Sequence, residues 1–196
     1  MYGKLMEYNS DQKKLFYDFF RAFNEKYFPC FPEPFKSDIS VSARYILLAI
    51  YSYMNRQGEA FPSMRTLSKI TGYTLKTVHN SINVLEQKGI ISIKKHHRYN
   101  CYLVKNFSPS LLAFIWIPKD IFDYYISPLA KITLCSLVWL KPRRDEVIIK
   151  TVKELAEFMN LSEKTVRKTL QELYYKEYIS FYNAGKIKFP KLLWRF

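Results

Sequence analysis

Apolar side chains recur at helical spacing in residues 66–93, and the rest of the chain can be arranged around this stretch. Leu67 and Ile70 give a first short helix its apolar side. Gly72 follows within the triplet TGY, which is typical of a tight turn. The pattern therefore predicts a short helix that ends in a turn.

A second, longer helix is predicted directly after this turn. Thr74 is a favourable N-cap, and Val78, Ile82 and Leu85 keep one apolar stripe facing inward. Gly89 can end the helix because glycine readily adopts positive φ, and the run IISI then favours a strand. This order of helix, turn, helix, glycine and strand resembles winged helix-turn-helix DNA-binding domains.

The same pattern recurs with an offset of 88 residues and without gaps from about residue 40 to residue 93. Leu67 corresponds to Leu155, and the cap Thr74 corresponds to Ser162. Caps thus align with caps and core positions with core positions. We interpret the chain as two copies of one fold in tandem.

Two departures distinguish the second copy from the first. Glu177 stands where the first copy has Gly89, so the second long helix must end without the favoured residue. The second wing, predicted over residues 178–189 around the turn sequence Asn183-Ala184-Gly185, is shorter than the first.

Flanking patterns predict the remaining elements. An aromatic helix is expected over residues 11–28, followed by an extended proline-rich connector. This helix either packs on the following domain or forms a homodimer contact. A short apolar strand and a helix opened by Pro118 come next, and Ser127-Pro128 starts another helix that runs to Leu140. Thr151 and Glu154 have the spacing of a capping box.

The predicted fold class is mainly α with small β-wings (α+β). It comprises an N-terminal helical arm and connector (residues 1–38), a first winged-helix domain (39–106) and a second one (107–196). The boundary between the two domains is placed at residues 106–110, which include Pro109.

The charge distribution indicates a polyanionic partner. The formal net charge is +14. The arm is neutral, whereas the first predicted domain carries +8 and the second +6, so the surplus lies on the globular parts. The three cysteines are far apart and suggest neither disulfides nor a zinc site. We expect a soluble cytoplasmic protein without metal or cofactor and, since nucleotide-binding loops and catalytic triads are absent from the sequence, without enzymatic activity.

Candidate DNA contacts are the polar residues on the outer faces of the two long helices, their caps and the wings. Asparagine can bind adenine with two hydrogen bonds, arginine can bind guanine, and lysine suits phosphates. The candidates are Thr74, Lys76, His79, Asn80, Asn83, Lys94, Lys95, His97, Arg98, Ser162, Lys164, Arg167, Lys168, Gln171, Lys186 and Lys188. Arg167 is the best single candidate for a guanine contact, and adjacent His96 and His97 fit a basic wing better than a nickase motif.

A further resemblance concerns function. The segment GEAFPSMRTLSKITGYTLKTVHNSINVLEQKGII resembles winged-helix modules of replication proteins and of plasmid and phage regulators. The segment TVKELAEFMNLSEKTVRKTLQEL is similar to the N-terminal domain of plasmid replication initiators. This resemblance implies a replication initiator of a mobile element that binds double-stranded DNA and recruits host replication proteins. A transcriptional regulator with the same helices is the first alternative, and a protein-interaction scaffold is the second.

Overall fold

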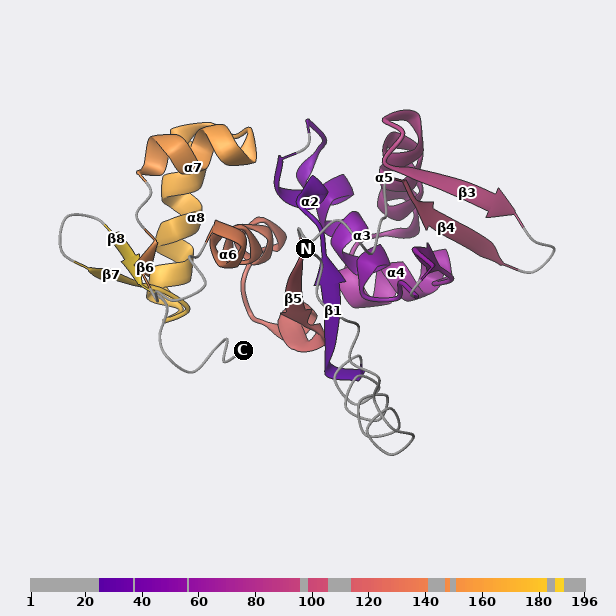
Figure 1. Cartoon of the computed structure of the whole chain (residues 1–196), viewed down its shortest axis with the longest axis horizontal. Coiled ribbons are helices and arrows are strands. Elements are labelled where there is room, and N and C mark those ends of the chain that lie inside the picture. The colour runs from indigo at the N-terminus through magenta and orange to yellow at the C-terminus, as the bar shows by residue number, and fades with distance from the viewer. Residues whose placement is uncertain are drawn as a thin grey trace, which may run out of the picture.

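The computed structural model describes residues 25–36, 38–55, 57–95, 99–105, 114–140, 147–148, 151–182 and 186–188. Within these ranges the fold is mixed α and β, with a pair of helices and a small sheet at each end and further elements between them (Figure 1). We call residues 25–105 the first half and residues 114–188 the second half.

The helices are α2 (Glu33–Lys36), α3 (Val41–Tyr51), α4 (Met64–Thr71), α5 (Leu75–Gln87), α6 (Pro128–Leu140), α7 (Val152–Met159) and α8 (Glu163–Tyr175), with the 3₁₀ helix η1 (Lys119–Asp123). The strands are β1 (Tyr27–Cys30), β2 (Glu59–Ala60), β3 (Ile91–Lys95), β4 (Asn100–Val104), β5 (Ile115–Pro118), β6 (Val147–Ile148), β7 (Ser180–Tyr182) and β8 (Lys186–Lys188).

The two helices predicted in the first half form as expected. The Thr74 hydroxyl caps α5 by accepting a hydrogen bond from the Thr77 amide at 3.2 Å. Gly72 ends α4 in the left-handed conformation with φ 72°, and Gly89, with φ 68°, follows the C-cap of α5. The inward positions of α5 are buried as predicted. The turn and the end of α5 therefore follow from local sequence.

The second half repeats this order at the predicted offset. Helix α7 matches α4 in length, and α8 matches α5. Thr151 and Glu154 form the predicted capping box. The three-stranded sheets also agree, because the order is β2-β4-β3 in the first half and β6-β8-β7 in the second.

Where the first half uses glycine, the second half forces other residues into left-handed backbone. Asn160 replaces Gly72 with φ 51°, and Glu177 replaces Gly89 with φ 61°. Asparagine tolerates this region, whereas glutamate adopts it at a cost. The glutamate thus carries backbone strain that the repeat imposes on it.

The prediction for the region around residue 28 was wrong. The expected helix over residues 11–28 lies mostly outside the described residues, but its last positions belong to β1, which pairs antiparallel with β5. Pro29 lacks an amide proton and disfavours helix in the residue before it, so a strand is the better local solution. The expected connector also contains α2, where Phe35 is fully buried.

Two smaller differences lie in the second half. The helix predicted after Pro118 is only the short 3₁₀ helix η1, with Pro118 as its N-cap. Strand β6 was not predicted, although the 88-residue offset makes its two residues equivalent to those of β2. The predicted boundary at residues 106–110 lies outside the described residues.

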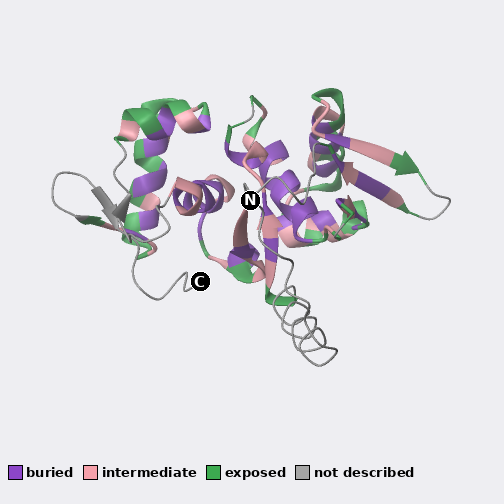
Figure 2. Ribbon diagram, viewed as in Figure 1, coloured by how far each residue is buried: buried purple, intermediate pink, exposed green. Residues whose placement is uncertain are grey.

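The centre of the molecule is formed by α3 and α6, which pack against each other. Residues 43–51 of α3 and 130–137 of α6 are all buried, as Figure 2 shows for the middle of the structure. Helix α3 also contacts α4 and α5, and α6 contacts α8. None of the helices in the described ranges is long and apolar enough to cross a membrane.

Replacing the strained residue tests how strictly the repeat fixes the backbone. Glu177→Gly should raise the free energy of unfolding by about 0.5–1 kcal/mol, because removing Cβ relieves left-handed strain, partly offset by a more flexible unfolded chain. The matched variant Gly89→Ala should lower it by about 1 kcal/mol. A Cβ at residue 89 would meet no atom within 4 Å, so the loss would come from the backbone alone. Urea unfolding measures the free-energy change of both variants. Equal changes for the two substitutions would contradict the assignment of backbone strain to Glu177.

Candidate nucleic-acid interface

Helix α5 has an exposed polar stripe opposite its buried face. The stripe, which we call the α5 stripe, consists of Lys76, His79, Asn80 and Asn83. Its first three members are exposed and Asn83 is half-buried. Residues spaced three and four apart lie on one side of a helix, so these side chains form one continuous polar surface. Four of the predicted contact residues are thereby brought together.

Two members of this stripe already interact. The Asn83 amide nitrogen lies 3.3 Å from His79 Nδ1, one helical turn away. A base contact by Asn83 would therefore compete with the imidazole, whereas exposed Asn80 lies closer to the start of the helix, where major-groove readers usually contact bases. Asn80 is accordingly the stronger candidate of the two.

Helix α8 carries the equivalent α8 stripe, which consists of Lys164, Arg167, Lys168 and Gln171. All four are exposed, while Val166, Leu170 and Leu173 are buried on the opposite side. With three cations the α8 stripe is more basic than the α5 stripe. The four predicted contact residues on α8 thus share one surface as well.

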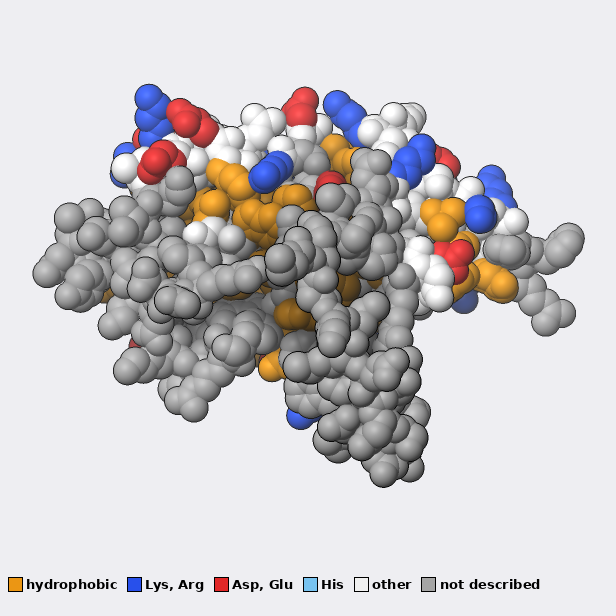
Figure 3. Space-filling view, in the orientation of Figure 1, with side chains coloured by type: hydrophobic (Ala, Val, Ile, Leu, Met, Phe, Trp, Pro, Cys, Tyr) orange, Lys and Arg blue, Asp and Glu red, His pale blue; other side chains and the backbone are white. Residues whose placement is uncertain are grey.

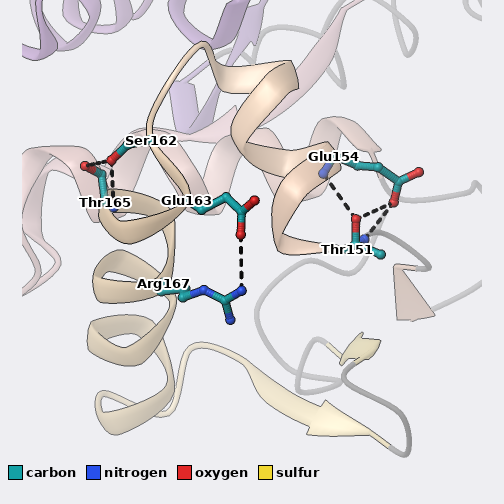
Figure 4. A network of polar contacts seen from close by, with 6 residues as sticks. All are labelled: Thr151, Glu154, Ser162, Glu163, Thr165 and Arg167. Carbon is teal, nitrogen blue, oxygen red and sulfur yellow. Dashed lines mark hydrogen bonds and ion pairs between the residues drawn. The ribbon is translucent and has the colours of Figure 1, made fainter.

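An acidic neighbour lies beside the predicted guanine contact. Arg167 Nη2 is 3.2 Å from the Glu163 carboxylate, one turn earlier on α8 (Figure 4). Both side chains are well exposed, at 62% and 46%, so solvent screens the pair and weakens it. The Glu163 carboxylate also lies in the first turn of α8, where the positive end of the helix dipole stabilises it. Arg167 is therefore held in place by a weak contact that a phosphate or a base could displace.

The predicted cap contacts have a structural role of their own. Thr74 and Ser162 each accept the amide of the residue three positions later, at 3.2 Å. Each hydroxyl also lies within 3.0 Å of that residue's hydroxyl. These side chains shape the first turns of α5 and α8, which present the exposed Lys76 and Lys164.

The wings are placed only in part. Lys94 and Lys95 are exposed on β3, which pairs with β4 to form the first wing. His96, His97 and Arg98 lie outside the described residues. Lys186 and Lys188 lie in β8, between β6 and β7, but their side chains are not described.

Sequence reasoning missed an aromatic pair at the first wing. Phe61 and Tyr99 are 45% and 51% exposed, and their ring centroids are 5.9 Å apart. Tyr99 directly precedes β4, whose first residue pairs with Lys95. The clue in the sequence is an aromatic residue in the predicted turn that follows the basic end of β3. In Figure 3, lysine and arginine side chains are visible at both ends of the upper edge, and those near the first wing lie beside hydrophobic side chains.

The three cysteines lie in the interior of the structure. Cys30, Cys101 and Cys135 are free and buried, and burial raises the pKa of the Cys135 thiol. A raised thiol pKa disfavours the reactive thiolate. Among the residues that the structure describes, no three His, Cys, Asp or Glu side chains gather as a metal site requires.

Comparison with known families identifies one of the helix pairs. Residues 37–91 match a family model described as a helix-turn-helix domain. The match spans α3, α4 and α5 and ends at the start of β3. A search of curated proteins gives no match to the chain. The chain therefore contains a helix-turn-helix domain, which supports binding to DNA.

Removing the acidic neighbour of Arg167 should strengthen DNA binding. Glu163→Gln is expected to raise affinity for a random-sequence duplex about threefold at low salt, because it removes repulsion of phosphates and releases Arg167. Fluorescence anisotropy at about 50 and 200 mM salt measures the effect. Glu157→Gln, an exposed acid on α7 outside the α8 stripe, is the control. Equal gains for both variants, or no gain, would contradict a role for the α8 stripe.

Proposed function

We propose that the chain binds double-stranded DNA sequence-specifically through two tandem winged helix-turn-helix domains, and that it acts by binding rather than by catalysis. The observation that carries this proposal is shared by both halves. Each half contains a pair of N-capped helices, and the second helix of each pair, α5 or α8, carries a polar stripe on its outer side. The family match supports the first domain directly. The second rests on the equal helix lengths, caps and strand order.

The two stripes differ in chemistry, so the DNA site should be asymmetric. The α5 stripe is rich in amides, with Asn80 suited to adenine, whereas the α8 stripe offers Arg167, suited to guanine. The first wing also has longer strands than the second. Neither half-site alone should then give tight binding, since the chain gains affinity by engaging both at once.

We assign this binding to replication initiation on a plasmid, phage or other mobile element. The support is the resemblance of both helix pairs to modules of replication proteins and initiators. Host replication proteins would then be partners, the protein would work in the cytoplasm, and a homodimer through the N-terminal arm would be an additional contact. The alternative is a transcriptional regulator that uses the same two stripes.

Loss of one reader in each stripe should abolish sequence preference. For Asn80→Ala combined with Arg167→Ala, the affinity ratio between a selected duplex and a random duplex should approach one, because each base contact contributes about 1–3 kcal/mol. Both side chains are exposed, so the unfolding temperature should not change. Competition binding against duplexes selected by the full chain measures the ratio.

The matched control combines Gln57→Ala with Lys153→Ala. These remove an exposed amide from the turn before β2 and an exposed cation from α7, outside the two stripes. This pair should keep the preference. If the Asn80 and Arg167 variant still discriminates as well as the unaltered protein, the stripes are not the readers.

Footprinting on the DNA that encodes the protein separates initiation from regulation. An initiator should protect several repeated sites in one region, whereas a regulator should protect a promoter. A scaffold protein would show no DNA affinity that falls with increasing salt. Protection of a promoter alone would replace the proposed initiator with the regulator.

A further inference from the structure

The ladder between β1 and β5 is two-fold symmetric under the 88-residue offset. Under the 88-residue offset, Tyr27 corresponds to Ile115 and Cys30 to Pro118. In the ladder, Tyr27 pairs with Pro118 and Cys30 with Ile115. Exchanging the two strands therefore reproduces the same ladder, as in the contact of a symmetric dimer, where one patch meets its own copy.

The elements beyond this ladder follow the same symmetry. Each strand leads into a short helix and then a long central helix, in the orders β1-α2-α3 and β5-η1-α6. The central helices α3 and α6 contact each other. The helix pairs and wings lie at opposite ends of the molecule, with α3, α6, β1 and β5 between them (Figure 1). The chain is thus built as a dimer within one polypeptide.

A buried arginine ties the first half to the second. Arg44, the fourth residue of α3, is 2% exposed. Its Nη1 donates to the Phe35 carbonyl at 3.2 Å and to the Met159 carbonyl at 2.7 Å, and its Nε donates to the Ile39 carbonyl at 3.0 Å. Met159 is the last residue of α7, so this guanidinium links α3 directly to the helix pair of the other half.

A buried lysine links the second half to the first, at a position that the 88-residue offset matches to Ala43 rather than to Arg44. Lys131, the fourth residue of α6, is 6% exposed. Its Nζ donates to the Phe122 carbonyl of η1 at 2.6 Å and to the Tyr45 hydroxyl of α3 at 3.2 Å. Burial lowers the pKa of this ammonium, and the Asp123 carboxylate opposes that shift. Each half therefore contributes one buried cation that binds its own short helix and also the other half.

We infer that Arg44 and Lys131 are positioning residues that hold α5 and α8 in one fixed two-fold arrangement, so that the chain reads two inverted half-sites at a single spacing. A two-fold relation reverses the direction of α8 relative to α5, as the symmetry of a dimer does on an operator. Buried hydrogen bonds of a charged group resist lengthening, because an unpaired buried partner is costly. This inference rests on the proposed DNA binding and adds the orientation and spacing of the site.

A distance measurement tests the fixed arrangement without DNA. Spin labels at Gln87→Cys and Tyr175→Cys occupy exposed, repeat-related positions on α5 and α8. The native cysteines are buried and should react slowly. The otherwise unaltered chain should give one narrow distance distribution. Arg44→Met and Lys131→Met should each broaden it, and an equally narrow distribution in both would overturn the inference.

Spacing tolerance tests the consequence for DNA. The full chain first selects its preferred site from a random duplex library. Derivatives of that duplex then carry either one to three extra base pairs between the half-sites or one half-site in reversed orientation. The unaltered chain should lose about 100-fold in affinity on each derivative, because one half-site disengages. Arg44→Met should lose less than about tenfold on the spaced duplexes. An equal loss in both proteins, or tighter binding to the reversed arrangement, would contradict the inference.

Two controls keep the result interpretable. Arg44→Lys retains the charge but cannot supply the same set of donors, so it should show intermediate spacing tolerance if Arg44→Met fails to fold. Lys88→Ala removes only an exposed contact with Asp38 at 3.9 Å and should behave like the unaltered chain. If the full chain selects no DNA sequence, the proposed function fails, while the distance measurement still decides whether the two cations position the helices.

Discussion

The structure depends on the contact between α3 and α6, two helices that are apolar on nearly every side. A helix of this kind must be covered on every side. Helix α3 is covered by α4, α5 and α6, and α6 by α3, α2 and α8. Neither half could bury its central helix alone, so the two halves form one core. The positions of α5 and α8 relative to each other follow from this shared core.

Much of each helix pair could be predicted from sequence because its determinants are local. Caps, turn glycines and three- and four-residue apolar spacing act within about one turn of helix. The 88-residue offset then transferred these assignments to the second half. Strand β6 also follows from this offset, because it occupies the position equivalent to that of β2.

The junction between the halves could not be predicted in this way. The pairing of β1 with β5 joins residues 85 to 91 positions apart, and Arg44 meets Met159 across 115 positions. Nothing near Tyr27 in the sequence identifies Pro118 as its partner. The signal in the sequence is indirect: Arg44 and Lys131 are the single charged residues of α3 and α6, and a buried charge requires partners from elsewhere in the fold.

Covalent linkage allows the two halves to differ in sequence while they keep the same order of helices and strands. In a homodimer, any change in a DNA-contacting residue appears in both subunits, whereas here His79 and Arg167 occupy equivalent positions independently. The same freedom applies to Gly89 and Glu177, where one half accepts strain that the other avoids. The central helices differ in sequence as well, but both remain mostly apolar, because each is part of the other's core. Divergence is therefore tolerated on the stripes and wings, and the buried cations at the centre keep those divergent surfaces in one arrangement.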